Sequence, residues 1–370
     1  RERPPHAASH AVGRCATEEA LKHFDTDGSA IRVGELKLTA RGRDAKDYQS
    51  PYGVVRVERY VYQSSRGGRI YCPLEHQARM IRGATPRFAS QISHKYAQLN
   101  AGAVQRDLEQ NHGRAVAKSY IQHVAEWVGS IATAKEEDWE YALPKLGASI
   151  ETVVVSLDGA MIPMADNEGY REAMVGTLSF YDLKGERQHT IYLAAAPEYG
   201  KSEFSQRLAR EIVRAKQHYP QARYLGIADG APSNWSFLEQ HTQRQLIDFF
   251  HVTEYVGKLA QARYPQRRAE AKRSRWQHQH CSNLKHDPKA VDVLIEEAAT
   301  LSRRTALSQA LRDGAYSAWT YLNNHRHHMN YPGFLAENLP IGSGVPEAAC
   351  KTLVKPRLCA SGMRWKIQGA

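Results

Sequence analysis

Two short apolar runs, each followed by an Asp-Gly pair, most restrict the folds open to this chain. The first covers residues 153–157 and is followed by Asp158, and the second covers residues 224–228 and is followed by Asp229. Apolar runs of this length that stop at turn-forming residues are typical of strands buried inside a sheet. The sequence therefore predicts a sheet in which two buried strands lead into acidic residues.

The surrounding pattern predicts an α/β fold with a mixed sheet that carries helices on its faces. Strands are expected at Thr152–Leu157, Ala173–Tyr181, Gln188–Ala195, Ala222–Ala228 and Gln245–Phe250, and helices at Lys201–Tyr219 and Trp235–His241. Residues 252–335 are helical in pattern and basic, whereas residues 336–370 return to the acid-bearing motifs. We therefore interpret 252–335 as an all-α insertion into the sheet domain of residues 150–251 and 336–370.

The N-terminal part predicts a separate region. Residues 1–50 are polar without a sustained period, which predicts a partly disordered segment with one helix near Ala16–Phe24. Residues 51–140 predict a β-hairpin followed by three helices at Thr85–Leu99, Ala101–Asn111 and Arg114–Ile131. Short helices joined by tight turns fit a helix-turn-helix-like DNA-binding unit with Arg114 and Lys118 exposed on its last helix. An ordinary helical bundle is the alternative.

Charge favours a polyanionic partner. The 370 residues carry a formal net charge of +11, and the excess is concentrated locally. Residues 263–275 hold six cations and one acid, and residues 348–370 hold five cations and no acid. Such patches suit nucleic-acid phosphates, although a solvated helix face is the plainer interpretation. The proposed DNA contacts are Arg114, Lys118, Arg267, Arg268, Lys272, Arg273, Lys351, Lys355, Arg357 and Arg364.

Cysteine usage and hydropathy bear on the compartment. The chain has five cysteines and no Cys-x-x-Cys motif, so neither a disulfide framework nor a structural zinc site is expected. No apolar run reaches the ~18 residues that a membrane span needs. We expect a protein of a reducing cytoplasm without membrane association.

A third acid completes the candidate site. Glu347 follows a glycine-containing turn and opens an expected helix. Asp158, Asp229 and Glu347 can converge on divalent metal, Mg²⁺ with Mn²⁺ as a substitute, in the arrangement used for phosphoryl transfer. Each has a simpler alternative: Asp-Gly turns for the two aspartates, and for Glu347 a favourable helix-dipole position or a surface pair with Lys351.

Two further patterns contain histidine. Asp248 and His251 form an Asp-x-x-His motif at an expected strand end, which fits either a role beside the metal site or a helix cap with a satisfied histidine. The segment 325–328, His-Arg-His-His, resembles metal-ligand chemistry but has no cysteine or acid at suitable spacing. We expect no metal there.

The motifs together resemble those of bacterial insertion-sequence DDE transposases of the ISKra type, which are related to the Mutator-like class. The matching segments are SLDGA at 156–160, ADGA at 228–231, DFFHV at 248–252, GSGVPE at 342–347, KPRL at 355–358 and GMRW at 362–365. The resemblance covers residues 150–365 well and the earlier residues weakly. It implies an RNase H-like core with catalytic Asp158, Asp229 and Glu347 on Mg²⁺, and with Asp248 and His251 beside them.

The resemblance also implies an activity and partners. The expected enzyme cuts the ends of a mobile element and joins the 3′-hydroxyl to target DNA, acting as a homo-oligomer on terminal inverted repeats in the bacterial nucleoid. The chain has no initiating Met and ends five residues after Trp365, where members of the group usually continue. Two alternatives therefore stay open: a truncated, inactive copy that only binds DNA, and a metal-dependent nuclease of the same fold.

Overall fold

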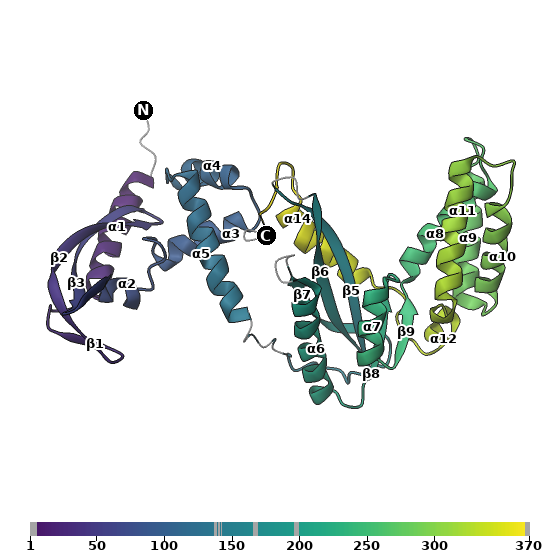
Figure 1. The fold of residues 1–370 in the computed structure, drawn as a ribbon, viewed down its shortest axis with the longest axis horizontal. Coiled ribbons are helices and arrows are strands. Elements are labelled where there is room, and N and C mark those ends of the chain that lie inside the picture. The colour runs from purple at the N-terminus through teal and green to yellow at the C-terminus, as the bar shows by residue number, and fades with distance from the viewer. Residues whose placement is uncertain are drawn as a thin grey trace. The chain divides into compact units, whose positions relative to one another are not determined.

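The structure is a computed structural model that describes residues 6–136, 139, 141, 143–165, 169–195 and 200–366. The chain divides into two compact units, residues 1–139 and residues 140–370. Each has its own sheet, and both sheets are combined with helices (Figure 1). The molecule is therefore a mixed α/β protein.

The first unit is built on a four-stranded antiparallel sheet in the order β1-β2-β3-β4. The strands are β1 (Ile31–Val33), β2 (Leu36–Ser50), β3 (Gly53–Ser64) and β4 (Gly67–Tyr71), and helix α1 (His6–Lys22) packs against β3. The prediction of partial disorder is wrong for residues 6–50. Strand β2 is polar and charged, but it pairs with β3 from Leu38 to Ser50 and buries Leu38 and Tyr48, so long-range pairing orders a segment that lacks a local pattern.

Four helices complete this unit. They are α2 (Pro73–Gln77), α3 (Pro86–Tyr96), α4 (Ala101–His112) and α5 (Lys118–Glu136). Helix α4 begins at the Asn100 cap, whose side chain accepts from the Ala103 amide, and ends at Gly113, which has a φ of 59°. Helices α3, α4 and α5 share a small core around Phe88, Leu108 and Ile121.

The second unit contains a five-stranded sheet in the order β7-β6-β5-β8-β9. Its strands are β5 (Thr152–Pro163), β6 (Tyr170–Tyr181), β7 (Arg187–Ala195), β8 (Arg223–Ala228) and β9 (Arg244–Ile247). Strands β5, β6 and β7 are antiparallel neighbours, whereas β8 runs parallel to β5 and β9 runs parallel to β8. The predicted mixed sheet is confirmed.

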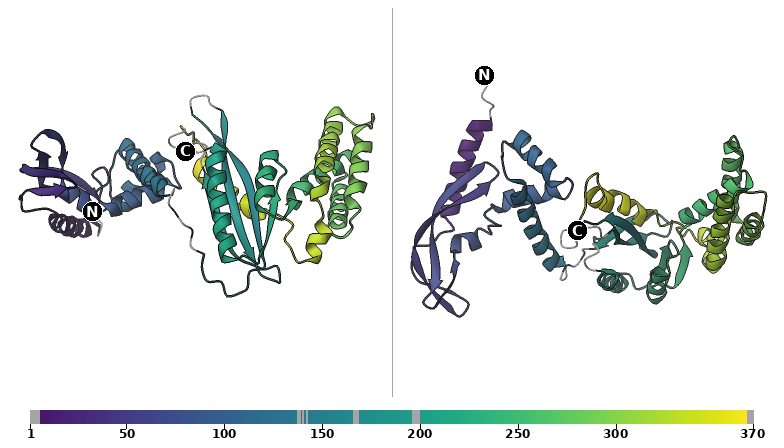
Figure 2. Two further views of the ribbon diagram at one scale, coloured as in Figure 1. Left: turned by 60° about the horizontal axis from the view of Figure 1, so that its bottom comes forward. Right: turned by 45° about the horizontal axis from the view of Figure 1, so that its top comes forward.

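Helices cover both faces of this sheet, as the right-hand view of Figure 2 shows. Helices α6 (Gly200–His218) and α7 (Pro232–His241) lie on one face, where Gly176 leaves no room for a β-carbon: one would come within 2.8 Å of Phe204 and 2.9 Å of Leu208. The C-terminal segment lies on the other face, where Ala349, Cys350 and Val354 pack with residues of β5 and β6. This segment consists of α13 (Gly344–Ala349), the π-helix η3 (Cys350–Val354) and α14 (Lys355–Leu358).

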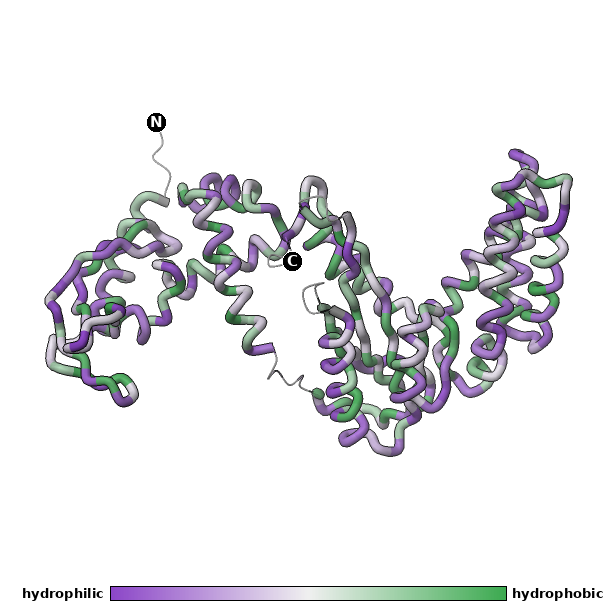
Figure 3. Tube along the Cα trace, viewed as in Figure 1, coloured by the Kyte–Doolittle hydropathy of each residue, from purple (hydrophilic) through white to green (hydrophobic). Residues whose placement is uncertain are grey.

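The chain between β9 and α13 is helical in the structure. It contains α8 (Phe249–Arg263), α9 (Glu270–His286), α10 (Ala290–Ser302), α11 (Gln309–His325), a short 3-10 turn (Arg326–His328) and α12 (Tyr331–Ala336). Hydrophilic and hydrophobic residues alternate along these helices, as expected for helices with one buried face (Figure 3). The strand predicted at Gln245–Phe250 is too long at its C-terminal end. Asp248 caps α8, so Phe249 and Phe250 are the first residues of that helix.

Candidate acidic site

The register of the parallel strands places three aspartates in one row. Leu157 of β5 pairs with Ala228 of β8, and Ala228 pairs with Ile247 of β9. Asp158, Asp229 and Asp248 are the residues that follow these three. Since carboxyl ends of parallel strands meet at one edge of a sheet, this row is where an open α/β sheet places a ligand.

The sequence predicted a strand that ends at Leu157, immediately before Asp158, but Asp158 lies inside strand β5. Strand β5 continues to Pro163, because its second half pairs with β6 after β8 has ended. Asp158 pairs with Val175 of β6 and therefore points to the face that the C-terminal helices cover. The three aspartates thus lie at the level of the sheet where β8 and β9 end and β5 continues.

Asp158 lies in a partly buried and negatively charged setting. Its Oδ1 accepts a hydrogen bond from the Gly159 amide at 2.7 Å, and the thiol of Cys350 donates a second bond to the carboxylate. Burial raises the pKa of Asp158, and the nearby charge of Asp229 adds to the rise. The two aspartates therefore lie close enough to repel each other.

Asp229 keeps one carboxylate oxygen available. Its Oδ1 accepts from the Ala231 amide at 3.1 Å and from Asn234 Nδ2 at 3.2 Å. No residue in the described part of the chain donates a hydrogen bond to Oδ2. The main chain is held in place as well, because Tyr321 donates from its hydroxyl to the Asp229 carbonyl at 2.8 Å.

Asp248 differs from its two neighbours in the row. It is fully buried, its Oδ1 accepts from the Phe250 amide at 2.8 Å, and Ser343 donates from Oγ to its Oδ2. Burial raises its pKa, and the Ser343 bond works against that rise. Asp248 is the N-cap of α8, and its hydrogen bond from Ser343 holds the turn that leads into α13.

Glu347 is on α13 but its carboxylate is engaged elsewhere. Its Oε1 accepts from Lys351 Nζ at 2.6 Å, which is the surface pair that the sequence left open. Among the residues that the structure describes, no three His, Cys, Asp or Glu side chains are grouped closely enough to hold one metal ion. The structure thus brings Asp158 and Asp229 together, with Glu347 one helix turn from the Cys350 thiol that bonds Asp158.

His251 lies near two of the acids. Its charge would lower the pKa of both Asp158 and Asp248, so the imidazole is within electrostatic reach of each. It is on the first turn of α8, three residues after the Asp248 cap, and is partly buried. Asp248 acts as the helix cap, and His251 is within electrostatic reach of two acids of the row.

Sequence reasoning missed three neighbours of the acids. Cys350 is buried, and burial together with the Asp158 charge raises the pKa of its thiol to about 12, so it stays protonated and donates. Glu254 of α8 lies in electrostatic reach of Lys351. His325 approaches the backbone of the second aspartate, since a β-carbon on Gly230 would lie 2.9 Å from its Nε2. Of these three, only His325 belongs to a sequence pattern that gives any signal, the His-rich segment 325–328.

The proposed DNA-contacting cations fall into two groups. The prediction that Arg114 is exposed on a helix is wrong: it precedes α5, is buried, donates to the Ser50 carbonyl and lies 5.1 Å from the centre of the Phe88 ring. Arg273 and Arg357 are also used internally, because each donates to two main-chain carbonyls of its own neighbourhood. The exposed cations are Lys118, Arg267, Arg268, Lys272, Lys351, Lys355 and Arg364.

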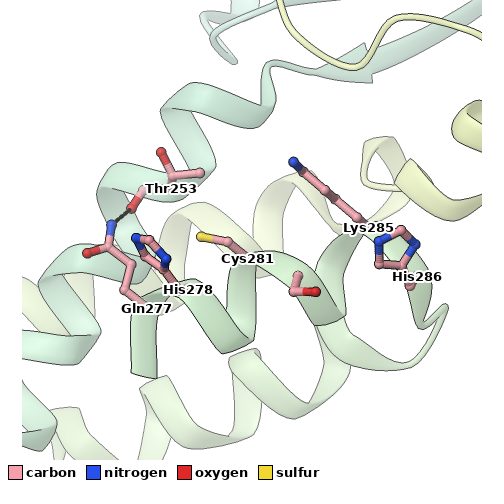
Figure 4. A pocket seen from close by; sticks show the side chains of 7 residues that line it. Thr253, Gln277, His278, Cys281, Lys285 and His286 are labelled. Carbon is pink, nitrogen blue, oxygen red and sulfur yellow. Dashed lines mark hydrogen bonds between the residues drawn. The ribbon is translucent and has the colours of Figure 1, made fainter. Parts of the chain in front are cut away.

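A hollow lies beside α8 and α9. It has a volume of about 490 Å³ and is lined by Thr253, Gln277, His278, Cys281, Ser282, Lys285 and His286 (Figure 4). Gln277 closes one side by donating from Nε2 to the Thr253 carbonyl at 3.0 Å. The lining contains no carboxylate and one permanent cation, so its chemistry is opposite to that of the aspartate row.

Comparison with known proteins does not extend these observations. No protein-family model matches the chain, and neither does any curated protein. Within the described ranges, none of the helices combines the length and the apolar character that crossing a bilayer requires. The acids and the sheet that positions them are therefore the features that bear on function.

Proposed function

We propose that this chain is a DDE-type transposase of the ISKra group, which cleaves and joins DNA strands by metal-assisted phosphoryl transfer. The observation that carries the proposal is the pairing of Asp158 and Asp229 on adjacent parallel strands. Both are partly buried, and the charge of Asp229 adds to the rise in the pKa of Asp158. Within the described residues, neither carboxylate is hydrogen-bonded to a lysine or arginine, and a divalent cation would relieve the repulsion between two such acids.

The sheet order supports an RNase H-like core. Three antiparallel strands, β5 to β7, occupy one side, and β8 and β9 add in parallel on the other side of β5. The first acid is on the central strand, the second follows the adjacent strand, and the glutamate is on a late helix. This is the placement that the sequence resemblance implies.

The donor set fits Mg²⁺. Asp158 and Asp229 would supply oxygen ligands, and Glu347 would join them after its carboxylate leaves Lys351. Bound metal would supply Lewis-acid stabilisation of the charge that builds up at phosphorus. The protein's own part is to hold the two aspartates in register, to fix the Asp158 carboxylate through Gly159 and Cys350, and to keep His251 beside them.

DNA is the proposed partner. The exposed cations Arg267, Arg268 and Lys272 precede or open α9, and Lys351, Lys355 and Arg364 follow the glutamate. Clustered cations neutralise phosphates and release counterions, which makes binding depend on salt. For the first unit, we propose that the sheet and helices, with Lys118 at the start of α5, contact DNA as well.

Strand joining tests this function. The substrate is a duplex with a pre-cut end whose sequence comes from the inverted repeats that border the gene. With Mg²⁺, the protein should join the 3′-hydroxyl to a target duplex, and Asp158→Asn should abolish joining while DNA binding is kept. Cleavage without joining would identify a nuclease instead, and binding without either reaction would identify a DNA-binding protein that lacks catalysis.

A further inference from the structure

The ammonium group of Lys351 lies among carboxylates from three different elements. It donates to Glu347 Oε1 at 2.6 Å on its own helical segment. Asp158 on β5 and Glu254 on α8 also act on its charge, and all three raise the pKa of Lys351, with Glu347 contributing most. The side chain itself is 61% exposed, so it is free to turn toward solvent.

The backbone on either side of Lys351 is fixed. Cys350 is buried against β5 and bonded to Asp158, and Val354 is buried in the same cluster. A long lysine side chain on a fixed backbone can exchange partners by rotating about its own bonds. Lys351 can thus move without disturbing the acids.

One carboxylate cannot serve the lysine and a divalent cation equally well. Metal at Glu347 would place two positive charges next to the ammonium group, which repel it. A lysine released there remains beside the acidic site, where a scissile phosphate would have to bind.

We propose that Lys351 couples metal binding to DNA binding: it neutralises Glu347 in the metal-free protein and transfers to a DNA phosphate when metal takes that carboxylate. This inference rests on the proposed function. It adds that metal creates a phosphate contact that the metal-free protein lacks. By linkage, DNA must then tighten metal binding by the same factor.

The test is the salt dependence of DNA affinity with and without a cation. Each phosphate contact contributes about 0.9 to the slope of log affinity against log salt. Binding of a random-sequence duplex is measured with EDTA and with a fixed concentration of Ca²⁺, an oxygen-ligand cation. Adding Ca²⁺ should make the slope steeper for both proteins. The increase in slope should be larger for the wild type than for Lys351→Gln, by about 0.9.

Lys272→Gln is the matched control, because it removes one exposed lysine on α9 and leaves the acids untouched. Its response to Ca²⁺ should equal that of the wild type, even if both of its slopes are lower. General competition between Ca²⁺ and salt for the duplex affects all three proteins equally and so cancels. Equal responses in the wild type and Lys351→Gln would overturn the proposal.

Metal titration without DNA distinguishes a failure of this proposal from a failure of the proposed function on which it rests. With its competing ammonium removed, Lys351→Gln should bind Mn²⁺ about twofold more tightly than the wild type, the scale of an exposed helical ion pair. Binding of Mn²⁺ with equal affinity by both proteins would overturn the coupling role but leave the metal site intact. If neither protein binds Mn²⁺, the proposed function fails as well.

Discussion

The two units of this protein place partly buried carboxylates in opposite electrostatic environments. In the first unit, Glu75 is bonded through Oε1 to Lys46 Nζ at 2.8 Å and to Tyr48 Oη at 2.7 Å, and Arg59 lies 3.7 Å away. Burial alone would raise the pKa of Glu75, but these donors hold it below its usual value. In the second unit, burial raises the pKa of Asp158 and the charge of Asp229 raises it further.

The contrast separates an acid held in a stabilising network from one that we propose to be functional. Glu75 links helix α2 to strands β2 and β3, so its charge contributes to stability. Among the described residues, Asp158 and Asp229 have no hydrogen bond from a lysine or arginine of the kind that Glu75 has, so the repulsion between them should destabilise the protein until a cation binds. Perturbed pairs of this kind mark functional sites more often than structural ones. The predictions below either break or sharpen this contrast.

The largest effect is expected at Asp229. Replacement by Asn removes one charge from the pair and should lower Mg²⁺-dependent cleavage by at least about 10³-fold, since metal contributes several kcal/mol to such reactions. Asp248→Asn, in the same row but bonded to Ser343 and Phe250, should keep activity within about tenfold. Cleavage rates of the two variants under saturating DNA make the comparison. Similar losses would mean that Asp248 also holds metal.

His251→Ala should have the next largest effect, a loss of about 10–100-fold in cleavage rate. The imidazole lies within reach of Asp158 and Asp248 without being grouped with them as a metal ligand. Asp248 would still cap α8, so the helix content measured by circular dichroism should not change. Full activity in this variant would reduce the Asp-x-x-His motif to a helix cap.

For Glu75, the expected change is in stability. Glu75→Gln leaves Lys46 and the 7% exposed Arg59 with fewer acceptors, which should lower the free energy of unfolding by about 2 kcal/mol. Cleavage per folded molecule should be unchanged. Urea denaturation of the variant and the wild type provides the measurement. A variant as stable as the wild type would show that this network is not stabilising.

The smallest effect has the opposite sign. Asp158→Asn should raise the free energy of unfolding of the metal-free protein at neutral pH by about 1 kcal/mol, since functional sites commonly sacrifice stability on this scale. The pKa of Asp158 is raised above its usual 3.8, so the folded protein holds the proton longer than the unfolded chain does. Its contribution to stability therefore falls as pH rises from about 3.8 through the raised value.

Glu75 should show the reverse pH dependence. Its pKa lies below the usual 4.5, so its contribution is present above that value and is lost as pH falls through the lowered one. Unfolding measured from pH 3 to 7 in EDTA, for the wild type and each single variant, resolves the two contributions. If both sites changed the free energy of unfolding with pH in the same direction, Glu75 and Asp158 would not differ as proposed.

Local pattern explains why the sheet of the second unit could be predicted. The strand containing residues 152–157 is a continuous apolar run, and helix α6 repeats its apolar residues every four positions at Phe204, Leu208 and Ile212. Strand β2 was missed because its stability comes from pairing with β3 rather than from its own composition. The prediction that Arg114 is exposed is wrong because a buried guanidinium can be stabilised by a carbonyl acceptor and an aromatic ring.

The acids of the site were predictable, but their contacts were not. Asp158 and Asp229 follow recognisable strands, and strand register brings them together. The bond between Cys350 and Asp158 depends on how the C-terminal helices pack on the sheet, which no local pattern encodes. The same holds for Ser343 and Asp248, which join distant turns. Sequence therefore indicates which residues carry charge, and packing decides which of those charges are balanced.

Calorimetric titration with Mn²⁺ tests the central claim most directly, because it needs neither DNA nor catalysis. The wild type should bind Mn²⁺ with heat that disappears or weakens at least about tenfold in Asp158→Asn and in Asp229→Asn, while Glu75→Gln should bind as the wild type does. Metal binding of equal strength in all four proteins, or in none, would contradict the claim that the Asp158 and Asp229 pair forms a divalent-metal site.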